Sequence, residues 1–143
     1  MRVFSSGEEV TNKTALSRRV ATCWNLEYSC LDDHITLCHP VEAPTGQKKH
    51  KLGAYHLTEA QWSLSIELHN LLKIFLTATL AFSRKEMPLV HESVELMEDI
   101  IQSLKVVRNS ASSPKGMPIS PVIHVAAHSG ILVAEKYFRL WQM

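Results

Sequence analysis

Cysteine and histidine side chains recur at one regular spacing in the first third of the chain. Cys30, His34 and Cys38 stand four residues apart, which places them along one side of a helix. Both residue types bind zinc, so a metal site is conceivable. A straight helix, however, separates Cys30 from Cys38 by about 12 Å, too far for two ligands of one tetrahedral ion. The spacing therefore favours reduced thiols that pack beside a helix.

The carboxylates form no catalytic set. Asp32 and Asp33 are neighbours, and adjacent residues of a helix do not face each other. They fit a solvated face, as do the acidic residues of segment 92–99. The short motifs of zinc peptidases, serine hydrolases, dinucleotide-binding folds and phosphate-binding loops do not occur in the sequence. We therefore predict no catalytic residue, no cofactor or cofactor-binding residue and no metal ligand.

Two other polar groups have both a functional and a structural interpretation. His124 and His128 are one helical turn apart but lack the glutamate of a zinc-peptidase motif, so a partly exposed pair is expected. Segment 48–51, Lys-Lys-His-Lys, is a short basic run. It could contact phosphates or serve in nuclear targeting, although a solvated loop is the simpler interpretation of so short a run.

The overall composition is that of a globular chain. Its 143 residues suffice for one domain, and the hydrophobic fraction of 45% and charged fraction of 20% are near globular averages. A net charge of +1 provides no overall attraction to nucleic acid or acidic membranes. The N-terminus lacks the apolar core of a signal peptide, and no apolar run approaches the roughly 20 residues that span a bilayer. We expect a nuclear or cytoplasmic protein, not secreted and without a membrane partner.

Apolar periodicity predicts an all-α domain over residues 18–143, after a flexible polar tail over residues 1–17. The first helix is indicated by apolar residues that recur every three or four positions, namely Trp24, Tyr28, Leu31, Ile35 and Cys38. Pro40 should end this helix, and residues 39–55 are expected to form a loop.

The strongest helix signal begins at Thr58. Thr58 and Gln61 have the spacing of a capping box, in which each side chain bonds the other residue's amide. A long run without Gly or Pro follows and predicts a helix over 58–83. Its expected buried stripe consists of Leu64, Leu68, Leu71 or Leu72, Phe75, Thr79 and Phe82.

Two further helices are predicted toward the C-terminus. One covers 88–108, with an apolar side made of Val90, Val94, Met97, Ile101 and Leu104. A loop over 109–121 separates it from a last helix, whose apolar residues include Val125, Ile131, Leu132, Tyr137 and Leu140. The short turn between 58–83 and 88–108 favours a central antiparallel pair. The expected fold is therefore all-α, with three to four helices around that pair.

Four stretches resemble, in order and spacing, the central region of hAT-superfamily transposases. They are Cys23-Trp24-Asn25 with Tyr28 and Leu31, Leu57 through Trp62, Leu72 through Pro88, and Val122 through Phe138. The resemblance covers residues 18–139 and implies the helical insertion that interrupts the RNase H-like catalytic domain of that family. The family's catalytic carboxylates, their divalent metals and its BED-type zinc finger would then lie outside this chain.

The resemblance implies a truncated or domesticated transposase fragment that is not an enzyme by itself and acts in the nucleus. Trp24 matches a tryptophan associated in that family with DNA near the cleaved end, so Trp24 is the one DNA-contact candidate. The arginine that precedes this tryptophan in the family is Cys23 here, and the serine that follows is Leu26. The alternative is a stand-alone helical protein-interaction module that binds itself or a helical partner. A small metal protein built on the Cys/His cluster has the least support.

Overall fold

The structure, a computed structural model, describes residues 15–18, 24–83, 90–112 and 118–141. Within these ranges the chain forms α1 (Trp24–Thr36), α2 (Cys38–Thr45), α3 (Glu59–Ser83), α4 (Val90–Asn109) and α5 (Pro121–Trp141), with two 3₁₀ turns, η1 (Lys48–His50) and η2 (Gly53–Tyr55). The described part contains no strand, only an isolated bridge between Ser112 and Pro118. The predicted all-α class is confirmed, with five α-helices instead of three or four. Most of the predicted tail, residues 1–14, lies outside the described residues.

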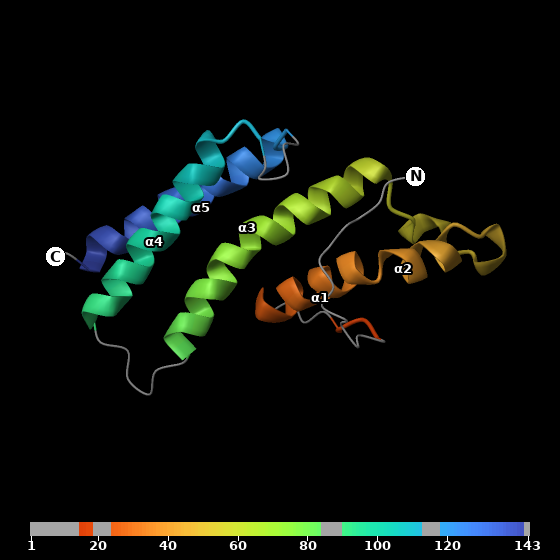
Figure 1. Cartoon of the computed structure of the whole chain (residues 1–143), viewed down its shortest axis with the longest axis horizontal. Coiled ribbons are helices and arrows are strands. Elements are labelled where there is room, and N and C mark those ends of the chain that lie inside the picture. Colours follow the sequence, from red (N-terminus) through yellow and green to blue (C-terminus); the bar gives the residue numbers. More distant parts are fainter. Residues whose placement is uncertain (1–14, 19–23, 84–89, 113–117, 142–143) are drawn as a thin grey trace.

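The long helix α3 occupies the middle of the molecule (Figure 1). Helices α1 and α2 form an arm on one side of it, while α4 and α5 lie on the other side. Helices α3 and α4 run in opposite directions, as the short turn between them predicted, but α4 packs most extensively against α5. The predicted pair 58–83 with 88–108 is thus antiparallel and in contact, but the most extensive helix pair of the described chain is α4 with α5.

The first predicted helix is divided into two. Helix α1 ends at Thr36, the chain turns at Leu37, and α2 then runs through Pro40. The prediction that Pro40 ends a helix was wrong because this proline lies in the first turn of α2, where backbone amides have no partner within the helix. Helix α2 also occupies the first part of the segment predicted as a loop, which begins only at Gly46.

The start of α3 is the predicted capping box. The Thr58 amide donates to Gln61 Oε1 at 2.8 Å, and the Gln61 amide donates to Thr58 Oγ1 at 3.3 Å. Along α3, Leu71 and Ala78 are buried, whereas Leu68, predicted to be buried, is exposed. The buried side chains of α3 do not form the single predicted stripe, because α3 contacts α1 along one part of its surface and α4 and α5 along another.

Length and composition alone would also allow α3 to cross a membrane, and it is the one helix of the described chain that meets this criterion. A single helix of this kind is weak evidence for a span, because helices of soluble proteins meet the same criterion.

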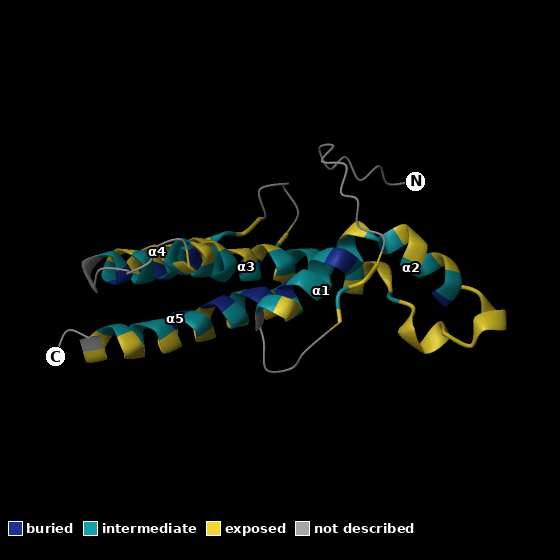
Figure 2. Ribbon diagram, turned by 90° about the horizontal axis from the view of Figure 1, so that it is seen from below, coloured by how far each residue is buried: buried dark blue, intermediate teal, exposed yellow. Residues whose placement is uncertain are grey.

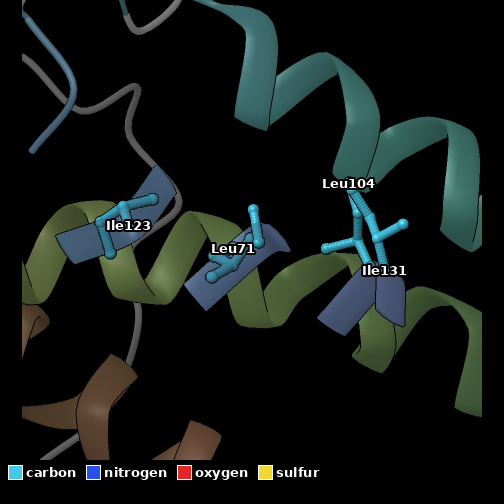
Figure 3. Close-up of a cluster of buried hydrophobic side chains, with 5 residues drawn as sticks. Leu71, Leu104, Ile123 and Ile131 are labelled. Atoms are coloured by element: carbon cyan, nitrogen blue, oxygen red, sulfur yellow. The ribbon is translucent and has the colours of Figure 1, made fainter. Parts of the chain in front are cut away.

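The core lies where α3, α4 and α5 meet. It consists of Leu71, Leu104, Ile123, Ala127 and Ile131. Figure 3 shows the labelled side chains of this cluster between the three helices. Leu104 and Ala127 have no exposed surface, so this junction is the most tightly packed part of the described chain.

The last predicted helix exists, but its expected apolar face is mostly on the outside. Of the residues predicted to be apolar contacts, only Ile131 is buried. Val125, Leu132, Tyr137 and Leu140 are 66%, 56%, 53% and 58% exposed. Helix α5 is apolar on two opposite sides, so periodicity alone identified the helix without identifying its inward side.

Small residues explain which side of α5 faces inward. Ala127 lies fully buried against the core, and a Cβ atom placed on Gly130 would come within 3.2 Å of Leu104 Cδ1. The missing side chain of Gly130 thus allows α5 to approach α4 closely. Glycine within a helix costs about 1 kcal/mol relative to alanine, and at Gly130 this close approach is the packing reason for it.

Candidate functional site

A polar and aromatic cluster joins α1 to α3. The Tyr28 ring stacks on the His69 imidazole with centroids 4.7 Å apart and an interplanar angle of 24°. His69 Nε2 lies 2.9 Å from Asp32 Oδ1 and can donate a hydrogen bond to this carboxylate. At the next residue of α1, Asp33 Oδ2 accepts a hydrogen bond from the Ser17 amide at 2.7 Å. Together these contacts fix the position of α1 against α3 and residues 15–18.

The prediction of a solvated face for Asp32 and Asp33 was therefore wrong. Asp33 is 2% exposed, and the Asp32 side chain is 35% exposed. Their surroundings come from parts of the chain that are distant in sequence, Ser17 and His69, and these supply hydrogen-bond partners that the pattern of α1 itself could not reveal.

A histidine held by a carboxylate can serve as a general base, but only with a reacting group at its other nitrogen. Here the His69 ring is covered by Tyr28, and its side chain is 17% exposed. The contact between His69 and Asp32 therefore holds α1 against α3.

Trp24, the DNA-contact candidate, is the first residue of α1, and its side chain lies outside the described part of the chain. The next residue, Asn25, is half-buried, and its Oδ1 atom has no hydrogen-bond partner. Leu26, which follows, is 37% exposed. The start of α1 is therefore partly buried at Asn25 and exposed at Leu26, close in sequence to the cluster that anchors this helix.

The basic segment 48–51 forms an exposed turn. Lys48, Lys49 and His50 make up η1, and Lys51 has a left-handed backbone with φ of 53°. The turn follows α2, whereas Trp24 begins α1, so the two lie at opposite ends of the arm formed by α1 and α2 (Figure 1). Trp24 and the basic segment therefore do not form one continuous binding site.

The Cys/His series gives no metal centre. His34 Nδ1 lies 2.7 Å from the main-chain oxygen of Cys30 and 3.6 Å from Cys30 Sγ. The imidazole thus donates back to its own helix, and Cys38 belongs to the next one. Across the described ranges, no three metal-binding side chains come together.

Polar contacts fix the start of α5 against α3 and against the end of α4. The Ser120 amide, at the start of α5, donates to Glu67 Oε2 of α3 at 2.7 Å. His124 Nδ1 donates to the Arg108 carbonyl near the end of α4 at 2.9 Å. His124 is half-buried and His128 is exposed, which confirms the partly exposed pair.

An open groove lies between α3 and α4. Its volume is about 350 Å³, and charged groups of Lys73 and Asp99 accompany the apolar side chains of Ile74, Leu96 and Ile100. Sequence reasoning placed these residues on separate helices but did not identify the groove, because its walls depend on how the two helices pack.

The most extensive apolar surface lies on α5. The outer face of α5 is defined here by six exposed residues: Val122, Val125, Leu132, Val133, Tyr137 and Leu140. Each is between 53% and 66% exposed. In Figure 2 exposed positions recur along the whole length of α5, on the side away from α3 and α4. An exposed, mostly apolar helix face of this length on a folded chain is typical of a protein-binding site.

No protein-family model matches the chain, and no curated protein or solved structure matches it. The similarity to hAT transposases therefore rests on the residues quoted for it.

Proposed function

We propose that the chain is the helical insertion of a hAT-type transposase, in a truncated or domesticated copy, and that it acts by binding and not by catalysis. The observation that carries the proposal is the correspondence between the similar stretches and the helices. The first stretch begins α1, the second opens α3, the third runs along α3, and the fourth forms most of α5. An all-helical unit of this kind fits an insertion domain better than a catalytic RNase H-like sheet.

DNA is the proposed ligand, and the start of α1 is the proposed contact. The contacts of Tyr28 and Asp32 with His69 hold the backbone of α1 against α3, and Trp24 is the first residue of α1. Base stacking on an aromatic ring contributes about 1–3 kcal/mol per base. The exposed basic segment 48–51 would add a weaker, salt-dependent attraction to phosphates. Such a protein would act in the nucleus.

Fluorescence anisotropy with labelled duplex and hairpin DNA tests this proposal. We expect Trp24→Ala to weaken binding at near-physiological salt about tenfold, because the stacking contribution is lost. Replacing Lys48, Lys49 and Lys51 with Gln is the control for charge. This triple variant should reduce the salt dependence of binding, whereas the loss of affinity caused by Trp24→Ala should remain. Circular dichroism of each variant should show unchanged helix content.

Two results would contradict the proposal. One is the absence of binding at low salt. The other is binding that disappears at moderate salt and does not respond to Trp24→Ala, since this would be non-specific attraction to phosphates.

The second candidate function is a stand-alone helical protein-interaction module. The specific observation in its favour is the outer face of α5, which carries six exposed large apolar residues. In this case, binding would involve a protein partner and would not depend on Trp24.

A further inference from the structure

We propose that the outer face of α5 binds the same face of a second copy of this chain, with the two helices antiparallel. This inference goes beyond the DNA contact and does not depend on it, because α5 and the start of α1 are separate surfaces (Figure 1). Three properties of the face support a second copy as its occupant: its area, the sizes of its side chains and the position of its charge.

The area is close to what a stable dimer needs. The six side chains are each more than half exposed and together present on the order of 500 Å² of apolar surface, so two copies would bury about 1,000 Å². A specific interface buries about 800 Å² on each partner. The polar neighbours Ser129 and Lys136, which lie between the apolar residues, would supply most of the difference.

The side-chain sizes favour an antiparallel pair. The face extends from Val122 to Leu140, so a two-fold axis through its middle passes near residue 131. Val122 would then lie opposite Leu140 of the second copy, and Val125 opposite Tyr137. Both of these contacts match a smaller with a larger side chain, which allows close packing at the two ends of the face. A parallel pair would instead place Tyr137 against Tyr137 and Leu140 against Leu140.

Charge favours the same orientation. Lys136 is the one charged residue within the face, and it lies five positions from the middle. In the antiparallel pair the two Lys136 residues are separated by about 15 Å along the axis, which exceeds the screening length of about 8 Å at physiological salt. Each lysine stem would lie over apolar surface of the other copy with its ammonium group in solvent. In a parallel pair the two ammonium groups would meet at the same level.

Sedimentation equilibrium of the full chain over a concentration series measures the proposed dimer. We expect a monomer–dimer equilibrium for the unmodified chain. Leu132→Asp should raise the dissociation constant at least about tenfold, because a carboxylate would be buried in the apolar interface. Val133→Asp is a second variant at an equally exposed position. The matched control is Val106→Asp, since Val106 is 66% exposed but lies on α4, and it should leave dimerisation unchanged.

A charge pair tests the orientation. Val122→Glu alone and Leu140→Lys alone should each weaken the dimer, whereas the double variant should recover at least most of the affinity. Within one chain the two positions are about 27 Å apart, so they cannot pair internally. Between antiparallel copies the introduced carboxylate would lie opposite the introduced ammonium group. Both charges also suit their helix ends, so the helix itself is not weakened.

Three outcomes would overturn the proposal. A chain that remains monomeric throughout the series leaves the face to another occupant, and binding of that monomer to neutral lipid vesicles would assign it to a membrane. A dimer that is indifferent to Leu132→Asp and Val133→Asp uses another surface. A double charge variant that is no better than the single ones excludes the antiparallel orientation. None of these results depends on DNA binding, so the two proposals fail separately.

Discussion

Leu104 has no exposed surface and lies where α4 meets α5. Truncating a buried leucine removes apolar contacts and leaves a cavity, at a cost of about 2–5 kcal/mol. We expect Leu104→Ala to lower the free energy of unfolding by this amount in a urea titration. Val106→Ala, on the same helix but largely exposed, should change it by less than about 0.5 kcal/mol. Equal effects of the two substitutions would contradict the assigned core.

The burial of a residue was predictable from the sequence where it depends only on the helix face that carries the residue. Ile101 and Leu104 were expected on an apolar side of their helix, and both are buried. Asp33 was expected in solvent and is buried, because Ser17 and other parts of the chain cover it. Leu132 was expected among the apolar contacts and is exposed. Burial of a residue depends on which neighbouring element packs over it, and a pattern within one helix does not contain that information.

At the scale of elements, the capping box determines where α3 begins. Thr58 and Gln61 each bond the other residue's backbone amide. We expect Thr58→Ala to destabilise the fold by about 1 kcal/mol in thermal or urea unfolding. Thr77→Ala, the same substitution within α3, should be neutral or slightly stabilising, because the Thr77 hydroxyl only bonds back to the Lys73 carbonyl. A larger loss from Thr77→Ala than from Thr58→Ala would exclude the role assigned to the cap.

The junction of α1 with α3 makes a second prediction at this scale. A double-mutant cycle with Asp32→Ala and His69→Ala should give a coupling energy of about 0.5–3 kcal/mol, because the two side chains contact directly. A cycle that pairs Asp32→Ala with His124→Ala is the control and should be additive, since His124 is bonded to Arg108 instead. Additivity in the first cycle would mean that the His69–Asp32 contact does not help to hold α1.

Helix positions were more predictable than helix partners. The helices over 58–83 and 88–108 were expected to within two residues, because caps and periodicity are local. The division of the first helix into α1 and α2 was not, since Pro40 is tolerated in a first turn. The close α4–α5 pair also escaped prediction, as it depends on Ala127 and Gly130 fitting against Leu104.

At the scale of the whole molecule, the helices enclose one small core and leave much apolar surface outside. The buried cluster joins α3, α4 and α5, whereas α1 is attached to α3 mainly through Tyr28, Asp32 and His69. The two binding proposals concern different places, the start of α1 and the outer face of α5. The first was predicted from sequence similarity. The second was not, because four of its six residues were expected on the apolar side of the last helix, and only the packing of α5 identifies them as surface.

If this chain binds DNA through the start of α1, the affinity for hairpin DNA must depend on Trp24. Hairpin DNA is titrated with the unmodified chain and with Trp24→Ala at near-physiological salt, with anisotropy as the signal. We expect saturable binding by the unmodified chain and an affinity about tenfold weaker for the variant. Identical curves for the two proteins, or no binding by either, would contradict it.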